Sequence, residues 1–257
     1  MLRLTTFVSA LALASAAMAE DIRVGVSPGE HAEIMEEVAK IAEPMGLNID
    51  VVEFSDYVVP NQALNDGDLN ANSFQHRPYL ENQIKDRGFE LVEVATTITT
   101  PMGIYSDEIE DMAELPEGAQ VAIPNDPTNG GRALLLLQEL GLISLAEDTG
   151  LVPSVLDITE NEKGLEFLEL DAAQLPRALA DADIAIINTN YALASGLSPK
   201  DDSIAMEKAD SPYVNIIVVR EGDEDAPWVS QLVEAYQSDE VKAFIDEKYE
   251  GAVLTSW

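Results

Sequence analysis

The side chains best suited to form a binding site are four aromatic rings and an imidazole that gather between residues 54 and 80, namely Phe54, Tyr57, Phe74, His76 and Tyr79. They fall in or just after predicted strand-to-helix turns, where a stripe of core residues is not expected. In open parallel sheets, ligands bind beyond the carboxyl ends of the strands. Aromatic side chains at that edge therefore predict a pocket for an apolar group. The alternative is ordinary packing and turn residues, and His76 alone is more often a structural histidine.

A second cluster, Asn129-Gly130-Gly131-Arg132, precedes an apolar stretch that predicts a helix over 132–140. Free N–H groups at a helix N-terminus attract an anion, and glycine lets a ligand approach the backbone. The planar guanidinium of Arg132 suits a carboxylate. The alternative is a surface arginine paired with one of many acidic residues. Three polar residues after a predicted buried strand are either further binding groups or turn residues: Asn188, Asn190 and Tyr191.

Ser27 offers the sharpest enzymatic hypothesis, because Gly25-Val26-Ser27-Pro28-Gly29 matches the G-x-S-x-G motif of esterases. Two features count against it. The oxyanion hole needs the backbone N–H of the residue after the serine, and Pro28 has none. The catalytic order also needs a late histidine, whereas both histidines lie in the first third of the chain. We therefore expect no enzyme activity.

Composition narrows the possible partners. The chain has 257 residues, of which 46% are hydrophobic, so a sizeable core can form. It carries 48 Asp and Glu against 14 Lys and Arg, a net charge of −34 that repels nucleic acid and anionic lipid. It has no cysteine and only two histidines, which makes disulfides and a thiolate or multi-histidine metal site unexpected. We expect neither metal nor cofactor.

Alternating strands and helices must position these residues. Apolar spacing predicts strands over 22–26, 49–54, 69–73 and 91–97, and helices over 31–42, 57–65 and 78–86. After Pro101 the pattern restarts, with strands over 120–123, 184–188 and 214–219, helices over 132–140 and 175–181, and two helices within 228–249. Such alternation is typical of right-handed crossovers and mostly parallel sheets.

The restart predicts two α/β lobes of similar build. We expect lobe 1 to comprise residues 20–100 and 210–257, and lobe 2 residues 101–209. The two segments that cross between them, 97–101 and 209–213, would form a hinge.

Residues 1–19 are typical of a cleaved secretory signal. Arg3 gives a positive start, 4–17 is an apolar stretch, and Ala17-Met18-Ala19 places small residues where a signal peptidase reads them. A membrane anchor is the alternative, but the stretch is short for a bilayer and polar sequence follows it. We expect a mature periplasmic protein that begins at Glu20.

Several runs resemble the methionine-binding NlpA/MetQ-type substrate-binding proteins of ABC importers, and the resemblance spans nearly the whole mature chain. The runs are Asp56-Tyr57-Val58-Val59-Pro60-Asn61, Asp68 to His76, Pro78-Tyr79-Leu80, Pro101 to Ser106, and Pro124 to Leu134. The resemblance implies a two-lobed periplasmic-binding-protein fold of type II-like architecture, with the solute in the cleft. It implies methionine, L and also D, as the ligand, and an inner-membrane permease and ATPase complex as the partner of a monomeric receptor.

The resemblance also implies roles for seven residues. Tyr57, Phe74, His76 and Tyr79 would line the side-chain pocket, Arg132 would take the α-carboxylate, and Asn190 and Asn215 would hold the amino group. Another apolar amino acid or a methionine-containing dipeptide remains an alternative ligand. The family usually carries a lipid-modified cysteine after the signal, whereas Glu20 stands here. We therefore expect no lipid anchor.

Overall fold

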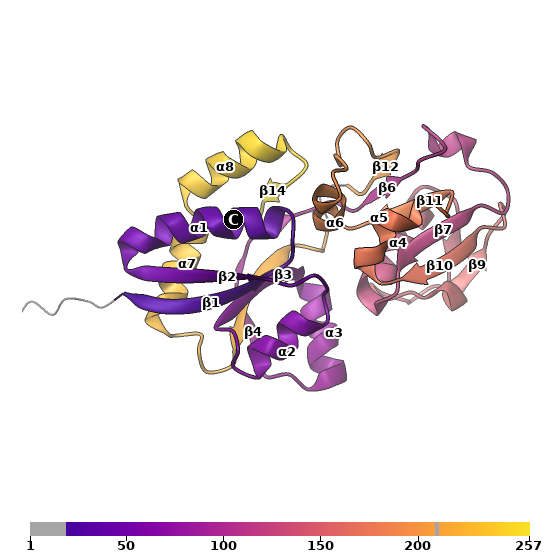
Figure 1. The fold of residues 1–257 in the computed structure, drawn as a ribbon. Helices are drawn as coiled ribbons and strands as arrows, with labels where there is room; N and C mark the ends of the chain where they lie inside the picture. Colours follow the sequence, from indigo (N-terminus) through magenta and orange to yellow (C-terminus); the bar gives the residue numbers. More distant parts are fainter. Residues whose placement is uncertain (1–18, 209–210) are drawn as a thin grey trace, which may run out of the picture.

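The computed structural model describes residues 19–208 and 211–257 and shows two α/β lobes joined by extended crossing segments (Figure 1). The predicted signal peptide, apart from its last residue, lies outside the described residues, as does the start of the predicted crossing 209–213. No helix in the part of the chain that is described is long and apolar enough to cross a membrane.

Lobe 1 is built on a five-stranded sheet of order β2-β1-β3-β13-β4. These strands are β1 (Glu20–Val26), β2 (Leu47–Glu53), β3 (Ala71–His76), β4 (Leu91–Thr96) and β13 (Asn215–Arg220). One face packs against α1 (Glu30–Ala42), α7 (Pro227–Tyr236) and α8 (Asp239–Tyr249). The other face packs against α2 (Val59–Asn65) and α3 (Arg77–Arg87). The C-terminal part of the chain therefore returns to the first lobe.

Lobe 2 repeats this plan in a sheet of order β10-β7-β11-β6-β12. Its strands are β6 (Gly103–Tyr105), β7 (Gln120–Pro124), β10 (Glu166–Leu170), β11 (Ile184–Ile187) and β12 (Ala205–Met206). Helix α4 (Pro127–Glu139) covers one face, and α5 (Leu175–Ala178) and α6 (Thr189–Ala194) cover the other. A ribbon of β8 (Ser144–Leu145) and β9 (Ile158–Glu160) lies beside α4. Strand β11 is buried throughout, as its apolar run predicts.

The prediction of mostly parallel sheets is half right. In each lobe the strand that arrives from the other lobe pairs antiparallel with both neighbours: β13 with β3 and β4, and β6 with β11 and β12. The remaining pairings within these two sheets are parallel. The entering strands follow no crossover helix within their own lobe, so nothing obliges them to run with the others.

Two predicted boundaries are wrong, and both affect the site. Strand β3 spans Ala71–His76 rather than 69–73, so Phe74 and His76 lie on the strand itself. Helix α4 begins at Pro127 rather than at Arg132, because the Asp126 side chain caps it by accepting from the N–H groups of Thr128 and Asn129. Proline at the first helical position suits this start.

The first crossing segment is braced by the C-terminus. Strand β5 (Ile98–Thr99) pairs antiparallel with β14 (Leu254–Thr255). The Thr99 and Ser256 hydroxyls are hydrogen-bonded at 2.7 Å.

Candidate ligand-binding site

A cavity lies between the lobes, where the carboxyl end of β3 meets α4. Its lining contains all seven predicted site residues: Tyr57, Phe74, His76, Tyr79, Arg132, Asn190 and Asn215. Five others complete it: His31, Gln75, Thr100, Asn129 and Asn188. Both lobes contribute, so the cavity is complete only when they lie together.

One wall of the cavity is aromatic. The Tyr57 and Phe74 ring centroids are 6.0 Å apart, and Tyr79 lies 6.2 Å from Tyr57 and 6.1 Å from Phe74. The Tyr79 hydroxyl donates to the Tyr57 backbone carbonyl at 2.8 Å, which holds the Tyr79 ring in place. Phe54, by contrast, lies apart from the cavity and packs in the apolar cluster beneath α2. The wall offers a preformed surface for an apolar side chain.

His76 ends β3 and caps α3, and its hydrogen bonds define its tautomer. Nδ1 accepts from the Tyr79 N–H at 3.1 Å, so Nε2 carries the proton and donates to Asn129 Oδ1 at 3.2 Å. Burial, helped by the nearby Arg132 guanidinium, lowers the pKa of His76 from 6.5 to about 3. The imidazole is therefore neutral at physiological pH and leaves the aromatic wall uncharged.

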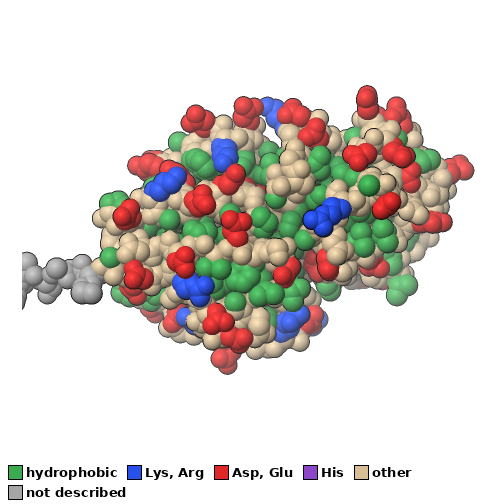
Figure 2. Space-filling view, viewed as in Figure 1, with side chains coloured by type: hydrophobic (Ala, Val, Ile, Leu, Met, Phe, Trp, Pro, Cys, Tyr) green, Lys and Arg blue, Asp and Glu red, His purple; other side chains and the backbone are tan. Residues whose placement is uncertain are grey.

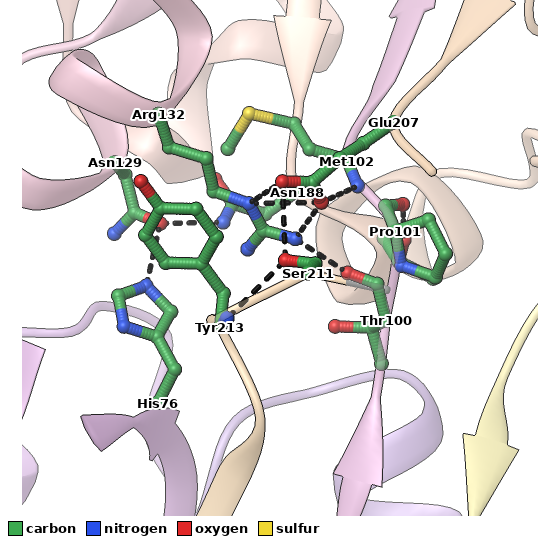
Figure 3. Close-up of polar contacts among 11 residues, drawn as sticks. His76, Thr100, Pro101, Met102, Asn129, Arg132, Asn188, Glu207, Ser211 and Tyr213 are labelled. Carbon is green, nitrogen blue, oxygen red and sulfur yellow. Dashed lines mark hydrogen bonds and ion pairs between the residues drawn. The ribbon is translucent and has the colours of Figure 1, made fainter. Parts of the chain in front are cut away.

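Arg132 supplies a positive charge to the lining of the cavity, and Figure 3 shows its polar contacts. It is 2% exposed, and Nη2 donates to the Thr100 carbonyl at 2.9 Å. The Tyr213 ring lies 4.4 Å from the guanidinium carbon, a cation–π contact. The Glu207 carboxylate accepts from Nε at 3.1 and 3.2 Å and also from Nη2. Nη1 is left without a hydrogen-bond partner among the described residues.

This geometry corrects the predicted anion site. Arg132 lies in the second turn of α4, and the N–H groups of the first turn are already taken by Asp126. The helix N-terminus is therefore not free to bind a ligand carboxylate. Gly130 and Gly131 allow close packing of the backbone. A Cβ at Gly130 would lie 2.7 Å from the Pro124 carbonyl oxygen, and a Cβ at Gly131 would lie 2.8 Å from the Leu151 carbonyl oxygen.

Amide side chains supply neutral polar atoms to the lining of the cavity. Asn190 Oδ1 accepts from the Tyr57 hydroxyl at 2.5 Å, across the lobes. Asn188 Nδ2 donates to Asn129 Oδ1 at 2.9 Å. Asn190 Nδ2 and Asn188 Oδ1 are buried and have no partner in the described part of the chain. Asn215, the first residue of β13, is 3% exposed. Unpaired buried polar atoms in a cavity indicate a polar ligand.

Sequence reasoning did not select His31, Gln75 and Thr100. Gln75 lies inside the run that supplied Phe74 and His76, but period-two alternation places it on the other face of the strand, where it bonds Asn61 and Asn72. Thr100 lies on a crossing segment without periodicity. His31 lies just after the turn that follows β1, and no sequence motif pointed to it.

Ser27 has no catalytic surroundings. Its side chain is fully buried, and among the described residues its Oγ has no hydrogen-bond partner, histidine included. Within residues 19–208 and 211–257, no group of three or more His, Asp or Glu residues is placed to hold a metal ion.

Two lobes of matching strand order around a cavity with apolar and polar ends define a two-lobed substrate-binding protein. The family model for NlpA lipoproteins matches residues 22–257, and the chain belongs to this family. Several relatives are named as methionine-binding or substrate-binding proteins, which places the chain among binding proteins and not among enzymes.

Three proteins similar to this chain are all named as binding proteins. The D-methionine-binding lipoprotein MetQ of Salmonella typhimurium is 52% identical over 92% of this chain and 88% of its own length. A nutrient-binding protein from Burkholderia cenocepacia, solved with methionine bound, is 52% identical with a TM-score of 0.90, covering 92% of this chain and 100% of that one. A periplasmic substrate-binding protein of an ABC transporter from Coxiella burnetii is 43% identical with a TM-score of 0.88, covering 91% and 100%.

Proposed function

We propose that this chain is the substrate-binding protein of an ABC importer and that it binds methionine, in L or D form. The observation that carries the proposal is the cavity itself, in which an aromatic wall faces a buried arginine across the two lobes. The relatives named for D-methionine binding and the relative solved with methionine support the choice of ligand.

Three kinds of contact would hold the ligand. Arg132 would bind the α-carboxylate through Nη1, the nitrogen left without a partner among the described residues. The unpaired amide oxygen of Asn188 and the amide oxygen of Asn215 would accept from the ammonium group, and Asn190 Oδ1, which already accepts from Tyr57, would share its second lone pair. The thioether would lie against Tyr57, Phe74 and Tyr79, with neutral His76 at their edge, because a polarisable sulfur packs well on aromatic rings.

We assign residues 20–100 and 210–257 to lobe 1 and 101–209 to lobe 2. The sheets support this assignment, since β13 joins the first sheet and the second is formed by β6, β7, β10, β11 and β12. The lobes would close on the solute as a monomer and present it to an inner-membrane permease and ATPase. We place the protein in the periplasm. The relatives are named lipoproteins, which argues against the expected lack of a lipid anchor.

Ligand screening by thermal unfolding tests the proposal. The protein is unfolded and refolded to remove bound solute, then melted with each common amino acid, both methionine enantiomers and short methionine peptides. A ligand at about a hundred times its dissociation constant adds roughly 2.7 kcal/mol to the free energy of unfolding. Methionine should give the largest shift. A larger shift with leucine or with a dipeptide would replace methionine by that solute, and no shift with any compound would refute the proposed function.

A further inference from the structure

Glu207 holds the nitrogens of Arg132 that would otherwise form a two-pronged contact with a ligand carboxylate. Its oxygens accept from Arg132 Nε at 3.1 and 3.2 Å and from Nη2 (Figure 3). The Thr100 carbonyl accepts a second hydrogen bond from Nη2, and Tyr213 stacks on one guanidinium face. The guanidinium therefore has a fixed orientation that leaves only Nη1 for the cavity.

Met102, just after the first crossing segment, and Ser211, on the second, hold Glu207 in turn. Its backbone N–H donates to the Met102 carbonyl at 2.9 Å, and the Met102 N–H donates to its carboxylate at 3.3 Å. The Ser211 hydroxyl, on the second crossing segment, donates to Oε1 at 3.2 Å. The Glu207 carboxylate is thus fixed relative to the hinge, and Arg132 is fixed through it.

The pair also sets the charge of the cavity. The Arg132 and Glu207 side chains are 2% and 12% exposed, so their opposite charges face each other with little water between them. The other lining side chains are neutral at pH 7, because burial keeps His31 and His76 unprotonated and the tyrosines un-ionised. A solute with a net charge would bring one unpaired charge into this dry cavity, which is strongly unfavourable.

We propose that Glu207 is a positioning residue that orients Arg132 and cancels its charge, so that the cavity selects solutes of zero net charge. A zwitterion satisfies this condition, because its carboxylate meets Nη1 while its ammonium meets the amides. The inference rests on the proposed function and extends it from the identity of the solute to the reason why the net charge of the solute matters.

Three methionine analogues of different charge test the inference by titration calorimetry: L-methionine, which is net neutral, 4-(methylthio)butanoate, which lacks the amine and is anionic, and methioninamide, which is cationic. Glu207→Gln keeps an oxygen for Arg132 and removes the negative charge. In this variant the affinity of the anion relative to methionine should rise at least about tenfold, and that of the cation should fall. A purely structural role would weaken all three equally.

Two further variants complete the test. Glu139→Gln is the matched control, since Glu139 is exposed on the neighbouring groove and pairs with Lys208 rather than with Arg132. In this variant the affinities of the anion and of the cation, each relative to that of methionine, should stay within about twofold of the wild-type values. Glu207→Asp keeps the negative charge but shortens the side chain by one methylene, so its contact with Arg132 weakens. Methionine affinity should then fall severalfold, while the affinities of the anion and the cation relative to methionine stay as in the wild type. Unchanged ratios in Glu207→Gln, or unchanged methionine affinity in Glu207→Asp, would overturn the inference. Failure of the wild-type protein to bind methionine would instead refute the proposed function.

Discussion

At the residue scale, Arg132 carries the main electrostatic contribution of the cavity. It is buried, oriented by Glu207 and stacked on Tyr213, so little side-chain freedom remains for a ligand to restrict. Contact with a fixed partner costs less conformational entropy than contact with a mobile one.

We expect Arg132→Ala to weaken methionine binding by about 2–5 kcal/mol, roughly thirtyfold to several thousandfold, because a buried charge pair loses one partner. The capped start of α4 offers no compensating N–H groups. Arg132→Lys should restore part of the loss, since an ammonium lacks the planar fork. Titration calorimetry of ligand-stripped proteins measures the effect, with the exposed Arg177→Ala as control. Equal affinity of wild type and Arg132→Ala would remove Arg132 from the site.

Glu30 is a second buried charged-type residue, and it makes the stability of the fold depend on pH. It is fully buried at the start of α1, and neither carboxyl oxygen has a hydrogen-bond partner among the described residues. Burial, with a smaller contribution from Glu33, raises its pKa from 4.5 to about 8. Burial lowers the pKa of the adjacent His31 to about 4, so the 3.7 Å contact between them joins two neutral groups near pH 7.

The sign of the Glu30 effect follows from these values. Between pH 4.5 and 8 the unfolded chain ionises Glu30 while the folded protein keeps it protonated, so the free energy of unfolding falls as pH rises through this window. Glu30→Gln removes this loss. The gain over the wild type should be larger at pH 7 than at pH 5 by roughly 2 kcal/mol. Urea unfolding at both pH values measures the difference in unfolding free energy between the two proteins. The contribution from titration of His31 cancels in this difference, because both proteins contain His31. A gain that does not depend on pH would show that Glu30 is ionised in the fold.

At the element scale, the start of α1 meets the start of α6 across the lobes. Gly29 has φ +86°, and a Cβ there would lie 2.5 Å from the Asn190 carbonyl oxygen. Two hydrogen bonds join the lobes at the same place: the Tyr57 hydroxyl to Asn190 Oδ1 at 2.5 Å, and the Tyr191 hydroxyl to the Ser55 carbonyl at 3.2 Å. Glycine here allows the lobes to approach.

Gly29→Ala should therefore impede closure and lower methionine affinity by at least about tenfold, since closure would force the methyl group against a backbone oxygen. Gly46→Ala is the control: Gly46 has φ +87° in lobe 1, and a Cβ there would have nothing within 4 Å. Both variants should lose roughly 1 kcal/mol of stability, because alanine disfavours positive φ. Only Gly29→Ala should lose affinity in calorimetry and remain open in small-angle scattering with ligand. Equal losses of affinity in both variants would assign the effect to backbone strain.

At the scale of the whole molecule, acidic side chains dominate the surface. They are spread over both lobes on the face shown in Figure 2, among few basic ones. The net charge of −34 makes the folded state repel itself, and salt screens such repulsion within about 3 Å at 1 M. Most of the ion pairs that salt would also weaken are exposed, and exposed pairs contribute little.

We therefore expect the urea midpoint to rise between low and molar sodium chloride. The slope of the unfolding free energy against urea should stay constant, because the surface exposed on unfolding does not change. Sodium sulfate would not serve, since it also strengthens apolar burial. A flat or falling midpoint would show that the charge is too widely spread to destabilise the fold.

The sequence by itself determined the order of elements and predicted seven of the residues that line the cavity. Apolar periodicity is a local property of the chain, so it predicted the alternating strands and helices and the restart after Pro101. Because strand ends gather at one edge of a sheet, it also brought Tyr57, Phe74 and His76 near one another. Residue types and spacing also selected Tyr79, Arg132 and Asn190, whereas the resemblance to the family added Asn215, and the lining of the cavity contains all seven.

Only the tertiary structure decided how these residues act, because the deciding contacts join segments far apart in the chain. Glu207 meets Arg132 across 75 positions, and Tyr57 meets Asn190 across 133. No local pattern encodes such pairs, since the first depends on the folding of lobe 2 and the second on the approach of the two lobes. The antiparallel entry of β6 and β13 depends on the same return of the chain. Local sequence therefore supplies the residue types of the cavity, whereas the pairing of Arg132 with Glu207 arises only when lobe 2 has folded, and the contact of Gly29 with Asn190 arises only when the two lobes lie together.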